Sequence, residues 1–464
     1  MKLLQDIRQF ASKGVNSLGN KMSDNKFLVI LAIFVGMISG FGAALLKDLI
    51  TWLSNVVKDV FPADHYNVLF LVLPVIGIVI CALYSRYVVK QDMEFGCERI
   101  HKNLVDKNYR LPRNIAYAPI VACSLTIGFG GSAGSEGPIA YAGAGIGSNV
   151  GKYFGLNDET LRILVIIGAA AGIAGIFKAP VGGAMFALEV LAMPMNTFSI
   201  TALMFSCLAA ACVAYAWSGF TIDIAYMPKN FFDPGMTLGV VMLGIFCALY
   251  AIYYNYAMHR TEKLFASIRN PWVKNVISGL LVGVLIFIFP VLYGEGYGVL
   301  NDIINGNNAD VMRDTILFNA HGPWVLIIFV AGTLLVKSIA TAATNSGGGV
   351  GGDFAPTLFA GCMGGLLFAY FSNHILGTHF DVANFALFGM AGVMAGTIQA
   401  PLMAIFLTLE MVGDFAMFFP LTICALISYA AVRLMHRHIL KDLLPSWLHH
   451  TRRNPHQSMQ QTTH

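Results

Sequence analysis

One short motif occurs twice in the chain, 221 residues apart, and this repeat constrains the fold more than any other feature. It reads A-G-x-x-x-A-P, then seven residues, then L-E, and it begins at Ala174 and again at Ala395. A glycine-rich turn that contains or ends in proline precedes each copy, at 130–138 and at 347–356. Chance does not supply several matching features in the same order. We therefore interpret 27–220 and 235–440 as two homologous halves, flanked by short segments at 1–26 and 441–464.

The composition indicates that the solvent of this chain is largely lipid. Hydrophobic residues make up 56% and charged residues 12%, whereas a soluble protein carries about 25% charged residues. This balance excludes an ordinary soluble enzyme and a disordered chain. We expect helices at the long apolar stretches, several of which could cross a bilayer; these are 27–50, 68–89, 237–257, 276–292 and 325–335.

Elsewhere glycine and proline interrupt the apolar sequence, which predicts half-length, broken helices. Irregular backbone at membrane depth is tolerated only where protein buries it or where it lines a cavity. If the two halves have opposite orientations, their broken helices meet near the midplane, where transporter folds place their substrate. The interrupted segments are 127–151, 168–193, 347–365 and 389–413.

The distribution of charge predicts the orientation. Both ends of the chain and the loops 86–113 and 260–274 are rich in Lys and Arg, so the positive-inside rule places them in the cytoplasm. The segment 295–314 is acidic and is expected to face outward. The net charge of +4 is too small for a nucleic-acid footprint. We expect a multi-pass protein of a bacterial inner membrane.

A helix that begins inside the membrane directs unpaired N–H groups and partial positive charge at whatever lies ahead of it, which suits an anion. Both glycine-rich turns lead into such a start, at Gly137-Pro138 and at Ala355-Pro356. Neither turn contains Lys or Arg, so we expect the attraction to come from dipoles alone. The alternative is close helix packing through small residues, which leaves the carboxylate in each turn unexplained.

Those carboxylates are Glu136 and Asp353. Ionisable groups at membrane depth are costly and usually functional. A glutamate at an anion-attracting helix start competes with the anion, and protonation would release it, so Glu136 is a candidate gate, with a structural N-cap as the alternative. For Asp353 a gate, a fixed charge and a helix cap remain open. Glu189 and Glu410 occupy matched positions of the repeat, for which a structural role is favoured.

Other chemistry is poorly represented. The eight cysteines lack a C-x-x-C pair, and the twelve histidines form no metal-binding pattern within an apolar segment. No nucleophile–base signature and no P-loop are present. We expect no enzymatic activity, cofactor or metal.

These motifs resemble the CLC chloride channels and chloride/proton antiporters. GSEGP at 134–138 is similar to the family's G-R/K-E-G-P motif, and GGDFAP at 351–356 is similar to its G-G-x-F-x-P motif. The resemblance covers about 27–440. It implies an all-α membrane fold of two inverted repeats, a homodimer with one pore in each subunit, and Glu136 as the gating glutamate. The anion site that it implies comprises Gly134, Ser135, Gly137, Gly352, Asp353, Phe354, Phe95 and Gly96.

The sequence departs from the family pattern at several positions. Ser135 replaces a basic residue, and Phe95 stands where a serine hydroxyl normally coordinates the anion. The pore tyrosine is missing from 436–441. Val190 occupies the place of the antiporters' inner proton-transfer glutamate, as in members that behave as channels. In having an acid at Asp353, the sequence resembles the fluoride exporters of the family.

We therefore expect chloride transport, channel-like or weakly coupled to protons, gated by Glu136. The main alternative is a proton-coupled chloride or fluoride antiporter, in which the proton reaches Glu136 through water or another acid. A transport-silent membrane scaffold and a sodium-coupled organic-anion carrier are further alternatives. The carrier predicts sodium dependence and a larger cavity.

Overall fold

The computed structural model describes residues 24–60, 68–90, 96–220, 224, 234–307, 311–312, 315 and 322–438. Within these ranges the regular structure is helical, apart from one isolated β-bridge, so the predicted all-α class is confirmed. Eight of the described helices are long and apolar enough to cross a membrane. The chain is thus a multi-pass membrane protein. The predicted cytoplasmic ends lie almost entirely outside the described residues.

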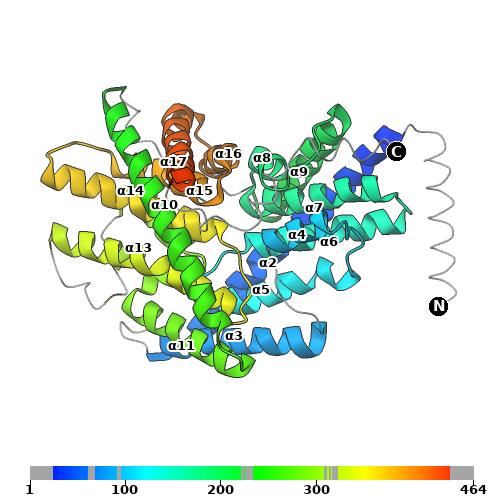
Figure 1. The fold of residues 1–464 in the computed structure, drawn as a ribbon, viewed down its shortest axis with the longest axis horizontal. Coiled ribbons are helices and arrows are strands. Elements are labelled where there is room, and N and C mark those ends of the chain that lie inside the picture. The colour runs from blue at the N-terminus through cyan, green and yellow to red at the C-terminus, as the bar shows by residue number, and fades with distance from the viewer. Residues whose placement is uncertain are drawn as a thin grey trace.

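Two series of helices follow one another along the chain and occupy opposite sides of the molecule in Figure 1. The first comprises α2 (Asp24–Val60), α3 (Leu73–Leu83), α4 (Cys97–Val105), α5 (Ala118–Gly128), α6 (Glu136–Tyr153), α7 (Asp158–Phe177), α8 (Pro180–Glu189) and α9 (Thr197–Trp217). The second comprises α10 (Thr237–Ala266), α11 (Pro271–Ile288), α12 (Tyr297–Ile304), α13 (Pro323–Ser346), α14 (Phe354–Ile375), α15 (Val382–Ile398), α16 (Pro401–Val412) and α17 (Phe418–His438).

The two series pack in the same way. Helix α2 packs on α5, α7 and α9, and α10 packs on α13, α15 and α17 in the same pattern. The pair α6–α7 matches the pair α14–α15. Helices α8 and α16 lie side by side where the two series meet, as Figure 1 shows, and α3 packs against α11. The repeat seen in the sequence is therefore a repeat of structure.

Two glutamates make equivalent contacts in the two repeats, and these contacts show that the repeats are inverted. Glu189, the last residue of α8, accepts hydrogen bonds from the N–H groups of Leu402 and Met403 at the start of α16, at 3.1 and 2.8 Å. Glu410 of α16 does the same for the start of α8. Each helix thus carries the N-terminal cap of the other, so the two run antiparallel. These contacts agree with the structural role expected for both acids.

The helix breaks lie where the glycines and prolines predict them, but some lengths differ from the prediction. Helices α5, α7, α13 and α15 end within the four interrupted segments or at their edges. Helix α14 has 22 residues, so it is not half-length. The stretch 68–89, predicted as one crossing, begins with a 3-10 turn, after which α3 continues without a break into a π-helix over Tyr84–Val89. Pro74 at the start of α3 contributes to the break after the 3-10 turn because it lacks an N–H.

Close backbone contact between α6 and α7 depends on glycine. A Cβ atom on Gly143 would lie 2.1 Å from the carbonyl oxygen of Gly168, and a Cβ on Gly168 would lie 2.1 Å from that of Gly143. Gly361 of α14 and Gly389 of α15 make the equivalent contact in the second repeat. Small residues at helix crossings therefore bring α6 and α14 into place, as is common in membrane bundles.

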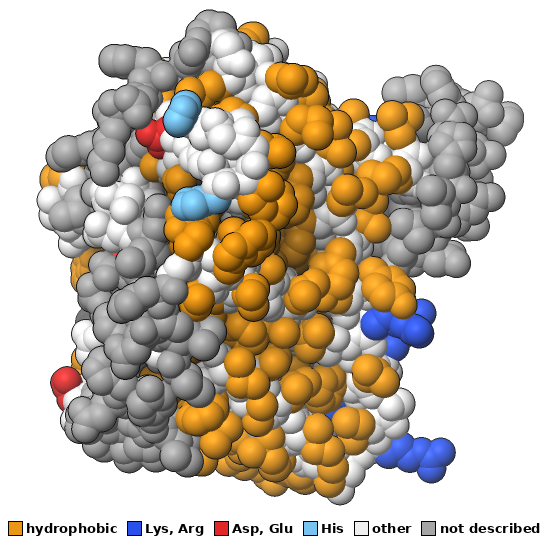
Figure 2. Space-filling model, turned by 90° about the vertical axis from the view of Figure 1, so that its left-hand side faces the viewer, with side chains coloured by type: hydrophobic (Ala, Val, Ile, Leu, Met, Phe, Trp, Pro, Cys, Tyr) orange, Lys and Arg blue, Asp and Glu red, His pale blue; other side chains and the backbone are white. Residues whose placement is uncertain are grey.

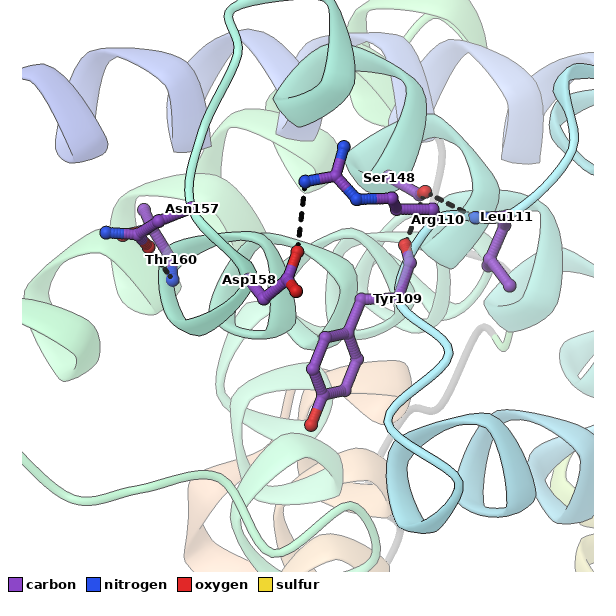
Figure 3. Close-up of polar contacts among 7 residues, drawn as sticks. All are labelled: Tyr109, Arg110, Leu111, Ser148, Asn157, Asp158 and Thr160. Carbon is purple, nitrogen blue, oxygen red and sulfur yellow. Dashed lines mark hydrogen bonds and ion pairs between the residues drawn. The ribbon is translucent and has the colours of Figure 1, made fainter.

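Side-chain hydrogen bonds secure the end of α6 that is remote from Glu136 (Figure 3). The Ser148 hydroxyl donates to the carbonyl of Tyr109 at 2.6 Å and accepts from the N–H of Leu111 at 2.8 Å. Beside them, Arg110 and the α7 residue Asp158 form an exposed ion pair at 3.0 Å. The buried Ser148 thus links the loop after α4 to α6. The Arg110–Asp158 ion pair adds little stability because it is exposed to solvent.

The outer surface is suited to lipid. Figure 2 shows a broad face covered by apolar side chains, with the charged side chains in view near its edges. Exposed apolar residues on the long helices include Leu238, Leu249, Leu280, Ile328 and Leu335. An apolar face of this extent would not be stable against water.

We predict that Gly168→Ala destabilises the protein by about 1–3 kcal/mol, because the new methyl group must push α6 and α7 apart. Thermal unfolding of the detergent-solubilised protein, followed by loss of the monodisperse species, measures this. Gly298→Ala is the matched control, since a Cβ on the exposed Gly298 of α12 meets nothing within 4 Å. Equal stability of the two variants would contradict the packing role of Gly168.

Candidate functional site

The two glycine-rich turns lie against each other in the interior. The N–H of Gly134 donates to the carbonyl of Gly352 at 2.9 Å, and the N–H of Gly352 donates to the carbonyl of Gly134 at 2.6 Å. A Cβ on Gly137 would lie 3.1 Å from the Cα of Gly352 and 3.3 Å from the Cα of Gly96. The starts of α4, α6 and α14 therefore converge on one point, and glycine permits that approach.

Two threonines hold the turns in a matched arrangement. The hydroxyl oxygen of Thr126, on α5, accepts from the N–H of Val350 at 2.9 Å. The hydroxyl oxygen of Thr344, on α13, accepts from the N–H of Ser132 at 3.2 Å. Each repeat thus fixes the turn of the other repeat. Because buried N–H groups need partners, these bonds favour a single turn geometry.

Glu136 occupies the centre of this arrangement. Its side chain is completely buried, and its Oε1 accepts from the N–H of Ala355, the second residue of α14, at 3.0 Å. Its Oε2 lies close to Gly134, where a Cβ would be only 2.1 Å away. Among the described residues Oε2 has no hydrogen-bond partner. A carboxylate from one repeat therefore fills the helix start of the other.

The two helices begin earlier than the sequence predicts. Helix α6 starts at Glu136 and α14 starts at Phe354, so Pro138 and Pro356 occupy the third helical position, not the first. The first four N–H positions of a helix lack intrahelical partners, so a proline at the third still removes no hydrogen bond. The expectation of N–H groups directed into the site is unchanged.

A buried lysine corrects the expectation that dipoles alone supply the positive potential. Lys337, on α13, is completely buried, and its Nζ donates to the Ser132 hydroxyl at 2.9 Å. Its ammonium also lies 4.8 Å from the centre of the Phe359 ring and interacts electrostatically with Glu136. A basic side chain thus reaches the first turn from a position roughly 200 residues away, although Ser135 itself is not basic. In the sequence, one feature could have indicated this residue: Lys337 is a lone basic residue just after the apolar stretch 325–335.

The remaining predicted residues have different surroundings. Asp353 is the N-cap residue of α14, but its carboxylate makes no capping bond; Asn345 donates to it at 3.3 Å. This geometry does not support the helix-cap alternative. Phe354 packs its ring edge-to-face against Phe186 of α8, with ring centres 5.8 Å apart. Val190 is buried at the C-terminus of α8.

Phe95, which the resemblance places at the anion site, lies outside the described residues. Gly96 is described: it precedes α4 with a φ of 142°, a conformation that favours glycine. Its Cα lies beside Gly137, so the start of α4 is next to the start of α6.

Glu295 belongs to the acidic segment 295–314 that is expected to face outward. Its Oε1 accepts from the N–H of Ser135, the N-cap residue of α6, at 2.9 Å. No local pattern connects residues that are 160 positions apart.

The chemistry of the site suits a small anion. The starts of α6 and α14 provide N–H groups, so the location attracts negative charge. No group of three or more His, Cys, Asp or Glu residues with metal-site geometry occurs in the described part of the chain.

Comparisons with known proteins agree with this chemistry. The model of the family described as "Voltage gated chloride channel" matches residues 76–433. The putative chloride channel protein ClcB-like of Ralstonia nicotianae is 28% identical over 365 residues, which cover 77% of this chain and 81% of the relative. The H(+)/Cl(-) exchange transporter ClcA of Vibrio cholerae is 28% identical over 314 residues, covering 65% of this chain and 62% of the relative.

The fold comparison gives the same result. The structure of a slow cyanobacterial Cl−/H+ antiporter aligns with a TM-score of 0.71 and 24% identity, covering 89% of this chain and 95% of that chain. This likeness confirms the predicted CLC-type fold. Since the family model matches well over half of the sequence, the chain belongs to the voltage gated chloride channel (CLC) family.

Proposed function

We propose that this protein transports chloride across a membrane, through a path between the starts of α6 and α14 that Glu136 gates. One observation carries the proposal: the Glu136 carboxylate accepts from the Ala355 N–H, the kind of group that would bind the anion. A carboxylate held there excludes chloride. Protonation removes the charge that holds it, and the chloride can then take its place.

The anion site in this proposal comprises the backbone of the three converging helix starts. Gly134, Gly137, Gly352 and Gly96 allow chloride to approach, and the N–H groups of α14 coordinate it. Burial strengthens the attraction because little water screens it. Lys337 would add positive potential, and because its side chain is buried it would not lie exposed in the path.

Proton coupling is the second candidate activity, and two observations bear on it. Similarity to the ClcA exchange transporter supports antiport of chloride against protons. Against strong coupling, Val190 cannot carry a proton, and the adjacent Glu189 is already bonded to the start of α16. We therefore propose channel-like or weakly coupled transport, with a proton-coupled antiporter of chloride or fluoride as the alternative.

We also propose a homodimer in a bacterial inner membrane, with both termini in the cytoplasm. Family membership supports the dimer, and the Lys and Arg content of the termini supports the orientation.

Purified protein in liposomes with a chloride gradient tests the main proposal, with chloride efflux and proton uptake recorded together. Chloride efflux without a stoichiometric proton flux supports the channel-like mechanism. A fixed ratio of protons to chloride supports the antiporter instead. Flux of fluoride without flux of chloride would assign the protein to fluoride export.

We predict that Glu136→Gln abolishes proton uptake while chloride efflux persists and becomes less dependent on pH. A glutamine cannot ionise, so it competes with chloride only weakly at any pH. The exposed Glu159→Gln on α7 is the control and should behave as wild type. Proton uptake that persists in Glu136→Gln would show that the gate is elsewhere.

We predict that Val190→Glu increases the number of protons taken up for each chloride released, because it adds a titratable group at the inner end of α8. Val190→Gln is the matched control, because glutamine has nearly the same size and polarity as glutamate but cannot ionise. The ratio of the two initial fluxes in liposomes measures the effect. An equal ratio in both variants would contradict a role for this position in coupling.

A further inference from the structure

Glu295 occupies the N-terminus of α6, which is the second helix start of the site. It lies between α11 and α12, outside both glycine-rich turns, and its Oε1 accepts from the Ser135 N–H at 2.9 Å. Glu136 fills the start of α14 in the same way. Each of the two helix starts that face the proposed path therefore carries a carboxylate, and the two carboxylates come from different parts of the chain.

A cavity lies beside Glu295, in addition to its hydrogen-bond partner Ser135. A cavity of about 200 Å³ is lined by Lys47, Ile50, Thr51, Glu295 and Tyr297. Thr51 is exposed, so the cavity reaches the surface of the protein. Lys47, which lies 5.7 Å from the centre of the Tyr297 ring, provides a positive charge there. The volume is sufficient for several water molecules or for a hydrated anion.

Ser135 has an unused polar group at this helix start. Its side chain is completely buried, and its hydroxyl has no hydrogen-bond partner among the described residues. Buried hydroxyl groups normally have a partner. An anion bound to the Ser135 N–H would lie close enough to the hydroxyl to accept a second hydrogen bond after a rotation about χ1.

We propose that Glu295 is a second gating carboxylate, in series with Glu136, and that the cavity beside it is where chloride waits before it displaces Glu295 from the start of α6. This rests on the proposed function, and it adds a site and a residue to it. Protonated Glu295 no longer competes for the Ser135 N–H, and the cavity provides space for its side chain. Lys47 attracts chloride into the cavity. The chloride then binds the Ser135 N–H and hydroxyl.

Glu295 and Glu136 set the direction of the pH effect, and several charged groups interact electrostatically with Glu295 or line its cavity. They are Glu136 on α6, Lys337 on α13 and Lys47 on α2; Cys123 on α5 and Tyr297 on α12 are the neutral titratable neighbours. Both glutamates compete with chloride only when ionised. Chloride flux should therefore decrease as the pH rises, and removing one acid should make that decrease shallower.

Glu295→Gln tests the proposal, because glutamine keeps an oxygen for the Ser135 N–H but cannot ionise. With the pH equal on both sides of the liposome membrane, we expect about tenfold faster chloride efflux at alkaline pH, the difference between a charged and a neutral hydrogen bond. We also expect a shallower pH profile than in wild type. A rate and a pH profile equal to those of wild type would reduce Glu295 to a structural cap and overturn the proposal.

A second measurement leaves Glu295 intact, in case the variant does not fold. Thr51→Cys places a thiol at the exposed rim of the cavity, for reaction with a negatively charged or a positively charged thiol reagent. The wild-type protein, with its exposed Cys212, is the control for background reaction. Slower chloride flux with the negative reagent and faster flux with the positive reagent support the cavity as the waiting site; equal effects of the two reagents would overturn it.

Different results would contradict chloride transport and the second gate. No chloride flux in wild type would contradict the proposed function. Normal chloride flux in wild type, with Glu295→Gln unchanged, would contradict only the second gate.

Discussion

The hydrogen bond from the Ala355 N–H to the buried Glu136 carboxylate is the interaction on which the rest of the site depends. A carboxylate inside a membrane protein is costly unless hydrogen bonds and positive potential compensate for its lost hydration. Here the start of α14 supplies the N–H, and the buried Lys337 of α13 bonds Ser132 in the neighbouring turn. The same compensation makes the location attractive to a free anion.

The inverted repeat produces this compensation twice. Antiparallel α8 and α16 cap each other through Glu189 and Glu410, and the threonines of α5 and α13 hold each other's turns. Glycine contacts between α6 and α7, and between α14 and α15, then direct the two helix starts at one point. Acidic side chains accept from unpaired N–H groups both between α8 and α16 and at the start of α14.

Much of the fold follows from the sequence because its determinants are local. Glycine and proline mark the breaks at α5–α6, α7–α8, α13–α14 and α15–α16, and the repeated A-G-x-x-x-A-P motif marks the two halves. Helix lengths follow less well: α14 extends to 22 residues, and the 68–89 stretch begins with a 3-10 turn and ends in a π-helix. Hydropathy alone does not specify these lengths.

The site could be predicted only in part, for a physical reason. Glu136, Gly134 and Gly352 lie in the motifs themselves, and the structure brings them together. Lys337 and Glu295 reach the site from segments far away in the chain, so no spacing rule connects them to Ser132 or Ser135. The sequence also suggested that dipoles act alone, because it could not show which helix lies behind the turns.

The most direct test is the location of bromide by anomalous scattering in crystals of wild type and of Glu136→Gln. If the Glu136 carboxylate occupies the place of the transported anion, the variant binds bromide at hydrogen-bond distance from the Ala355 N–H, and in wild type the carboxylate fills that place. A variant whose α14 start remains without bromide, at a bromide concentration that supports transport, would contradict the account.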